Sequence, residues 1–440
     1  MLIRIFKRRC RSVVRGSLLL GCLAISSGTL AETASTHIAD ASSAVVLIKA
    51  HLKHGLFEDD DATDRWTGSG FLIDREKGWI VTNAHVSGHG PTNLRARFEG
   101  QKQFTKAERV FVDSKYDVAI IKVDPELVKD RVPLSLDCDY EFNRGDKIFS
   151  IGHPNAQEFT FSTGVLSGQK DFHVEGSYFT TDTVVEPGSS GGPVVLRETG
   201  KVIGMMTAGF NSSDLGFLTK SHDICRITEL MAVGKNPARP RFKFQTMVID
   251  EEISSIVGAV FHPSIGLEMG DEILSWNGNL WHPDTDGDLA DAMRGYEDDR
   301  VTLSILRDGL EELVEIPVSR GKSLHETEWV FFTGLMITED DKNDSSFFNG
   351  NIPPPILVIE SIDTDFDDSS GIEFESGNEI FSVDSKSRLN LRDLYDHLEA
   401  VTKDQKVKVV ARVYNSTAEA YTLWMQQSFA VEGLDCSWCN

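Results

Sequence analysis

Basic residues and long apolar segments are both scarce in this chain. Its 440 residues include 44 lysines and arginines against 68 aspartates and glutamates, and the net charge is −24. A surface of this charge repels nucleic acids and anionic lipids, so we expect no nucleic-acid partner. The apolar run of the N-terminal region, residues 18–25, is shorter than the roughly 20 residues that a membrane-spanning helix needs.

The first 31 residues are typical of a secretory signal peptide. A basic stretch precedes the apolar run, and small residues follow it near a potential cleavage site. This segment holds six basic residues and no acid, so its removal lowers the net charge from −24 to −30. We expect a soluble exported protein that begins near Glu32, in the periplasm or a similar compartment. The alternative is a lipoprotein processing site, which would anchor the protein through Cys22.

Metal-binding motifs are also absent from the sequence. The histidines do not show the H-E-x-x-H spacing of zinc proteases. The acidic clusters at residues 284–288 and 363–368 lack the glycine and glutamate of an EF-hand loop, so they are interpreted as solvated loops. The sequence therefore predicts neither a metal nor a cofactor.

Cysteine is sparse, with six in the whole chain and two of these in the signal segment. The remaining four, Cys138, Cys225, Cys436 and Cys439, allow three pairings in an oxidising compartment. The close C-terminal pair could be redox-active or half of a zinc site. No thioredoxin-like pattern precedes it and no second pair lies nearby, so a small structural disulfide is favoured.

What the sequence does contain is a histidine, an aspartate and a serine in three well-marked segments. His85 lies in T-N-A-H-V, Asp117 in Y-D-V-A-I-I and Ser190 in E-P-G-S-S-G-G-P. A serine hydroxyl is a poor nucleophile at neutral pH and needs a base, which a third group must orient. Free histidine, with a pKa of about 6.5, can accept that proton. We therefore predict Ser190 as nucleophile, His85 as base and Asp117 as the group that orients the base.

The glycines around Ser190 have a mechanical role in this prediction. Backbone N–H groups can converge on a developing oxyanion only where the chain turns sharply without side chains in the way. The expected oxyanion donors are the N–H groups of Gly188 and Ser190.

Five segments resemble the HtrA (Deg) family of serine proteases, and the resemblance is strong over residues 40–230. It implies a chymotrypsin-like fold, the catalytic roles of His85, Asp117 and Ser190, Gly188 at the oxyanion hole, and a trimer-based homo-oligomer. One departure is Ser189, where the family usually has asparagine. Both residues are small and polar, so we expect the turn to be kept. The segments are residues 68–73, 79–86, 116–123, 151–154 and 186–193.

The length of the chain suggests two to four domains. Short strands with turn signals between residues 44 and 219 predict a β-barrel pair, and residues 266–278 resemble the centre of a PDZ domain, with a weaker echo at 371–384. The expected fold is mostly β, a chymotrypsin-like double β-barrel followed by two PDZ-like domains. The expected boundaries are a signal peptide at 1–31, the protease domain at 37–235, the first PDZ-like domain at 242–320, a divergent second one at 328–430, and a tail with the close cysteine pair at 431–440.

Substrate selection should come from the pocket beside the nucleophile. In this fold its walls come from the segment before the nucleophile and the strand after it, which here contain no acid apart from Glu186 in the turn. We therefore predict cleavage after small or medium aliphatic residues of unfolded chains. The predicted pocket residues are Val184, Val185, Met206, Thr207 and Ala208.

A PDZ groove adds an extended peptide to a sheet edge and holds its carboxylate in backbone N–H groups. The stretch F-T-G-L-M-I resembles such a loop, so peptides with free C-termini are predicted to bind at Gly334, Leu335, Met336 and Ile337 and to activate the protease. The alternative is that Gly334 simply lies in a strand or bulge.

Together these features predict an ATP-independent serine endopeptidase that cleaves unfolded or misfolded exported proteins. The alternative is a periplasmic chaperone or peptide-binding protein with little proteolysis. Digestion of casein without ATP separates the two hypotheses.

Overall fold

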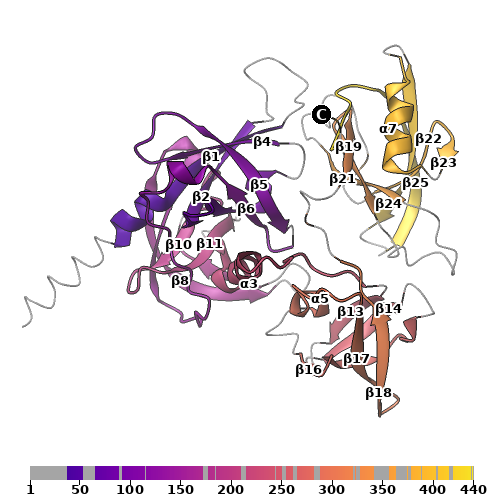
Figure 1. Cartoon of the computed structure of the whole chain (residues 1–440), viewed down its shortest axis with the longest axis horizontal. Helices are drawn as coiled ribbons and strands as arrows, with labels where there is room; N and C mark the ends of the chain where they lie inside the picture. Colours follow the sequence, from indigo (N-terminus) through magenta and orange to yellow (C-terminus); the bar gives the residue numbers. More distant parts are fainter. Residues whose placement is uncertain are drawn as a thin grey trace, which may run out of the picture.

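The structure is a computed structural model of the whole chain (Figure 1). The predicted signal peptide and Cys22 lie outside the residues that it describes. No helix among the described residues is long and apolar enough to cross a membrane. The described residues are 37–52, 65–88, 92–113, 115–171, 177–183, 185–209, 215–242, 244–249, 254–260, 265–281, 288–320, 323, 328–340, 356–362, 374, 378–387, 389–402, 405–415, 420–437 and 439.

The first barrel is a closed sheet with the strand order β1-β2-β3-β6-β5-β4. In strand β4, Leu94, Ala96 and Phe98 point inward and alternate with polar residues. That alternation is the usual signal of a half-buried strand. The strands are β1 (Val45–Leu52), β2 (Arg65–Asp74), β3 (Trp79–Thr82), β4 (Thr92–Phe98), β5 (Thr105–Asp113) and β6 (Val118–Lys122).

The second barrel closes in the order β10-β11-β12-β9-β8-β7. Helix α3 (Ser221–Ala232) follows it, and Ile224 and Ile227 on one helix face pack into the main apolar core. The predicted mostly β fold with two barrels is confirmed. The strands are β7 (Lys147–Gly152), β8 (Thr160–Asp171), β9 (Ser177–Thr181), β10 (Pro193–Leu196), β11 (Val202–Gly209) and β12 (Gly216–Lys220).

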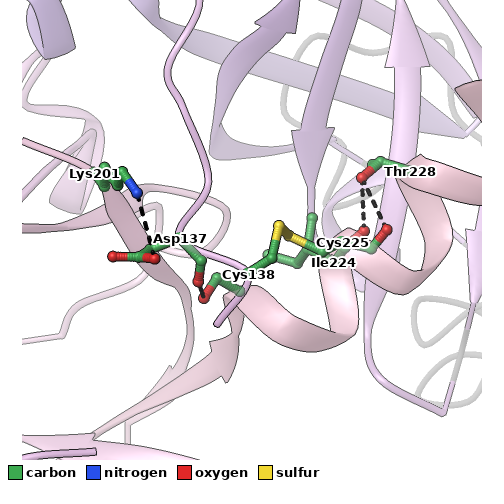
Figure 2. The surroundings of a disulfide bond; sticks show 7 residues. Asp137, Cys138, Lys201, Ile224, Cys225 and Thr228 are labelled. Carbon is green, nitrogen blue, oxygen red and sulfur yellow. Dashed lines mark hydrogen bonds and ion pairs between the residues drawn. A yellow bond between two sulfur atoms is a disulfide. The ribbon is translucent and has the colours of Figure 1, made fainter. Parts of the chain in front are cut away.

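A disulfide between Cys138 and Cys225 ties the segment between the barrels to helix α3 (Figure 2). Their Cα atoms are 5.8 Å apart. Beside it, the Ser221 hydroxyl donates to the carbonyl of Asp137 over 2.6 Å, and Lys201 lies 3.6 Å from the Asp137 carboxylate. Of the three pairings that the sequence allowed, the structure selects this one together with Cys436–Cys439.

The first module, residues 244–318, is a sheet with the order β13-β14-β15-β17-β18, and β16 pairs with β15. Its helix α5 (Leu289–Ala292) is capped by Asp288, whose side chain accepts from the Asp291 N–H. The strands are β13 (Phe244–Ile249), β14 (Ser254–Val260), β15 (Glu272–Trp276), β16 (Asn279–Leu280), β17 (Arg300–Arg307) and β18 (Leu310–Pro317).

The second module, residues 329–436, has the order β25-β24-β22-β21-β20-β19-β26, and β23 pairs with β22. Helix α7 (Leu391–Glu399) buries Leu391, Leu394 and Leu398, which the helical repeat places on one face. The predicted separate tail instead joins this sheet through β26. The strands are β19 (Trp329–Phe332), β20 (Leu335–Asp340), β21 (Ile356–Ile362), β22 (Glu379–Val383), β23 (Lys386–Ser387), β24 (Lys406–Asn415), β25 (Ala420–Ala430) and β26 (Asp435–Cys436).

Candidate active site

His85 and Asp117 meet at one end of the first barrel. His85 lies on the short helix α2 (Ala84–Ser87), directly after β3, and Asp117 lies in the turn between β5 and β6. The Nδ1–H group of His85 donates to Asp117 Oδ2 over 2.7 Å, and the His85 backbone N–H donates to Oδ1 over 3.0 Å. The carboxylate thereby fixes the tautomer in which Nε2 is free to accept a proton.

Ser190 enters the site from the turn before β10 in the second barrel. Its hydroxyl donates to the carbonyl of Thr207 over 3.0 Å, and its own carbonyl accepts from the Ser69 N–H over 2.7 Å. In the part of the chain that the structure describes, the Ser190 hydroxyl makes no hydrogen bond to His85. The sequence-predicted triad thus has its histidine and aspartate joined and its serine hydroxyl turned toward the strand behind it.

The turn that precedes Ser190 is closed by the Ser189 N–H, which donates to the carbonyl of Glu186 over 2.9 Å. The Ser189 side chain lies 3.4 Å from the Glu186 N–H and supports the same turn. Gly188 has a positive φ of 97°, and a Cβ there would lie 2.3 Å from the carbonyl oxygen of His153. Only glycine fits this position without a clash.

A buried side-chain network supports the oxyanion turn from behind, and the sequence reasoning missed it. The Ser69 hydroxyl donates to the Gly188 carbonyl over 2.7 Å, accepts from the His153 N–H over 3.1 Å and lies 3.0 Å from His153 Nδ1. Burial lowers the pKa of His153 to about 4, so the imidazole is neutral near pH 7. Ser69 lies in the G-S-G motif, which is the one sequence signal that could have pointed to it.

A second network crosses between the two barrels beneath the site. The Asn83 side-chain amide donates to the Asp117 carbonyl over 2.9 Å and to Thr207 Oγ1 over 3.1 Å. Thr207 Oγ1 is 2.6 Å from Thr219 Oγ1, which donates to the carbonyl of Tyr116 over 3.3 Å. These bonds connect the strand beside Ser190 to the turn that carries Asp117.

Comparison with known proteins agrees with this geometry. Residues 68–205 match the family of trypsin-like peptidase domains. Protease Do-like 1 of Arabidopsis thaliana is 35% identical over 162 residues, which cover 34% of this chain and 36% of that protein. Human serine protease HTRA3 is 33% identical over 179 residues, 37% of each chain.

A protein of Chlamydia trachomatis described as a probable periplasmic serine endoprotease, DegP-like, is 28% identical over 284 residues, 58% of this chain and 54% of that protein. The trypsin-like domain is thus similar in sequence to serine proteases of the HtrA/DegP family. This chain spans about half or less of the length of these curated relatives.

Solved structures of the HtrA-type protease AlgW show the same fold. The complex with a decapeptide aligns with a TM-score of 0.52 at 20% identity, over 66% of this chain and 99% of that chain. The complex with a tripeptide gives a TM-score of 0.53 at 20% identity, over 66% and 98%. At this identity the likeness concerns the fold.

Two of the predicted pocket residues have other roles in the structure. The Met206 side chain is 1% exposed and belongs to the core of the second barrel. The Thr207 side chain is buried in the network that crosses between the barrels, and only its carbonyl contacts Ser190. Val185 packs against the same barrel core. Val184 and the side chain of Ala208 lie outside what the structure describes.

The predicted peptide-binding residues of the second module are placed differently by the structure. Gly334 is the second residue of a two-residue hairpin turn between β19 and β20, with a φ of 78°. Leu335, Met336 and Ile337 belong to β20, which pairs with β19 on one side and β21 on the other, and all three side chains are buried. The prediction of a carboxylate site there is therefore wrong, because β20 has no free edge to receive a peptide.

Proposed function

We propose that this chain is an ATP-independent serine endopeptidase of the HtrA type, which cleaves unfolded or damaged exported proteins. The single observation that carries the proposal is the His85–Asp117 pair. Its 2.7 Å hydrogen bond leaves His85 Nε2 able to accept a proton, and the pair lies in the same domain as the glycine-rich turn that holds Ser190. The relatives described as periplasmic proteases support the exported location.

In the proposed reaction, the Ser190 hydroxyl rotates from the Thr207 carbonyl toward His85 Nε2 and attacks the scissile carbonyl carbon. His85 accepts the hydroxyl proton and returns it to the leaving amine, while Asp117 stabilises the imidazolium. The acyl-enzyme is then hydrolysed by water with His85 again as base. The N–H groups of Gly188 and Ser190 stabilise the oxyanion, and neither donates to a backbone carbonyl among the described residues.

The substrate range follows from what surrounds the nucleophile. Val185 packs against the core of the second barrel, and the two segments predicted to form the pocket walls contain no acid apart from Glu186 in the turn. We therefore infer that the site favours small or medium aliphatic side chains before the scissile bond. The peptide complexes of AlgW support binding of extended segments by proteins of this fold. A homo-oligomer built on trimers is part of the same proposal.

The experiment is casein digestion without ATP by the wild type, Ser190→Ala and Ser135→Ala. Ser135 is an exposed serine in the same domain and serves as the matched control. Ser190→Ala should abolish cleavage with an almost unchanged melting temperature, because a single hydroxyl contributes little to stability. Cleavage by Ser190→Ala at the wild-type rate would refute the assignment. An inactive wild type that prevents client aggregation would favour the chaperone alternative.

A further inference from the structure

The catalytic-aspartate turn, of which the structure describes residues 113 and 115–117, joins β5 to β6. Asp117 has a φ of 51°, in the left-handed region that a residue with a side chain rarely adopts. Such a conformation persists only where the surroundings hold it. Within the turn, the Asp113 carboxylate accepts from the Tyr116 N–H over 3.0 Å. The position of Asp117 thus depends on what holds Asp113, Lys115 and Tyr116.

The holding groups come from the first module, around helix α5. Lys115 Nζ lies 2.8 Å from Asp288 Oδ2 and 2.6 Å from Asp291 Oδ2. Arg294 NH1 lies 2.7 Å from Asp113 Oδ2, and Arg294 NH2 lies 3.0 Å from Asp291 Oδ1. Two side chains of the turn are therefore clamped by one short stretch of the module, which lies beside α3 in Figure 1.

Burial makes this ion cluster strong and specific. The Asp291 side chain is 0% exposed, that of Arg294 2% and that of Asp113 5%. Charges removed from water interact strongly, and each needs partners to offset its lost hydration. The linker between α3 and β13 supplies Arg239, which contacts Asp288 and Asp291. Three acids therefore face three cations.

Further contacts tie the same region to the protease domain. Arg226 on α3 donates to the carbonyl of Asp291, and Arg294 NH1 donates to the carbonyl of Pro237 in the linker over 2.7 Å. The Ser323 hydroxyl, just after the module, accepts from the Val112 N–H over 2.8 Å and donates to the Val112 carbonyl over 3.0 Å. Val112 immediately precedes the catalytic-aspartate turn, which is therefore held on both sides.

We propose that Asp291, with Lys115 as its partner, acts as a positioning residue for the catalytic aspartate. The inference rests on the proposed function. When the cluster is intact, the turn holds the Asp117 carboxylate against His85. When the module shifts, the turn relaxes, the histidine loses its orientation and catalysis falls.

The purely structural alternative is that the cluster only joins two domains. Removing a charge would then lower the melting temperature without changing the reaction itself. A buried aspartate elsewhere in the same module provides the matched control. Asp271 is 2% exposed and bonds Arg307 over 2.7 and 2.6 Å, and none of its ion-pair or hydrogen-bond partners belongs to the turn.

The test uses the full chain and the variants Asp291→Asn, Lys115→Met, the double variant, Lys115→Arg and Asp271→Asn. Each is assayed below its own melting temperature for kcat and KM with a peptide substrate, and for the rate of Ser190 labelling by a fluorophosphonate. We expect Asp291→Asn and Lys115→Met each to lower kcat and the labelling rate about tenfold or more, with KM within about twofold. Lys115→Arg should restore most of the rate.

The effects of the two single variants should not be fully additive, because both variants remove the contact between Lys115 and Asp291. Asp271→Asn should lose stability and keep its kcat. Lys115 is partly accessible, at 16% exposure, so Lys115→Met carries the test if Asp291→Asn does not fold. Wild-type kcat in Lys115→Met, or equal kcat losses in Asp291→Asn and Asp271→Asn, would overturn the inference. A wild type that neither cleaves nor reacts with the fluorophosphonate would instead refute the proposed function.

Discussion

The two C-terminal modules place a helix beside an antiparallel sheet and use that helix in different ways. In the first module, α5 spans four residues and presents its acids to the protease domain. In the second, α7 spans nine residues and packs three leucines onto its own sheet. The comparison teaches that similar modules need not share a role, because the role depends on which side chains face outward at the helix.

The two modules also differ in how they are held in place. In the second module, β26 covers β19, with Val330 opposite Cys436, and the hairpin turn is bonded to the chain after β25 through Thr333, whose N–H donates to the carbonyl of Glu432 over 2.8 Å. The first module is held to the protease domain by buried charges, and the second is closed on itself by its own C-terminal segment.

The largest effect is expected from Arg294→Met in the first module. The change leaves Asp113 and Asp291 buried without this guanidinium, which should lower the free energy of unfolding by about 3–5 kcal/mol. The matched change in the second module, Arg392→Met, breaks an exposed pair with Glu328 and should cost less than about 1 kcal/mol. Urea unfolding of both variants measures the difference, and equal losses would remove the contrast between the modules.

Protonation of His153, which lies inside the protease domain, should change the free energy of unfolding independently of the two modules. His153 has a pKa lowered by burial to about 4, against about 6.5 when unfolded. The unfolded state therefore binds more protons between these values. The contribution of neutral His153 is complete above pH 6.5 and is lost as the pH falls toward 4, by roughly 3 kcal/mol.

His153→Gln should lack this pH dependence, which is measured as the difference in unfolding free energy between wild type and variant at several pH values. Burial raises the pKa of Asp223 to about 6, which acts in the opposite direction, but Asp223 is present in both proteins and cancels in the difference. A difference that stays constant from pH 7 to 4 would contradict the prediction.

A smaller effect is expected from removing the C-terminal disulfide of the second module. The cysteines of this pair are three positions apart, and closure of so short a loop contributes about 2 kcal/mol in the chain-entropy description. The double variant Cys436→Ser and Cys439→Ser should therefore melt earlier in the second module only. Casein cleavage should remain at the wild-type rate, and a loss of activity would show that this module also acts on the site.

The smallest effect is expected at Thr333. Its hydroxyl donates to the carbonyl of Ala430 over 2.5 Å and accepts from the Glu432 N–H over 3.2 Å. Thr333→Val keeps the shape and removes these bonds, so it should cost about 1 kcal/mol. Hydrogen exchange should become faster at residues 430–437 and not in the first module. Unchanged exchange there would mean that the hydroxyl does not hold the segment.

The sequence predicted those features of the fold and the site that depend on short contiguous motifs. The segments around His85, Asp117 and Ser190 each lie at a strand end, so the pattern predicted the two barrels that bring them together. The bonds from Asn83 to Thr207 join residues 124 positions apart, and no local pattern indicates such a pair. The sequence analysis placed Asp288 in a solvated loop, whereas the structure pairs it with Lys115 and Arg239. The polar sequence around Asp288 does not indicate these partners, because both lie far away in the chain.

Under the proposed function, the Cys138–Cys225 disulfide has a consequence for how long the molecule survives cleavage by other copies of itself. The bond encloses every strand of the second barrel and Ser190 within one covalent ring, while His85 and Asp117 lie in the chain before it. A single self-inflicted cut between residues 139 and 189 would leave the nucleophile tethered to its base instead of releasing it. Such nicked molecules should migrate as one species in gels without reductant and as two fragments with it.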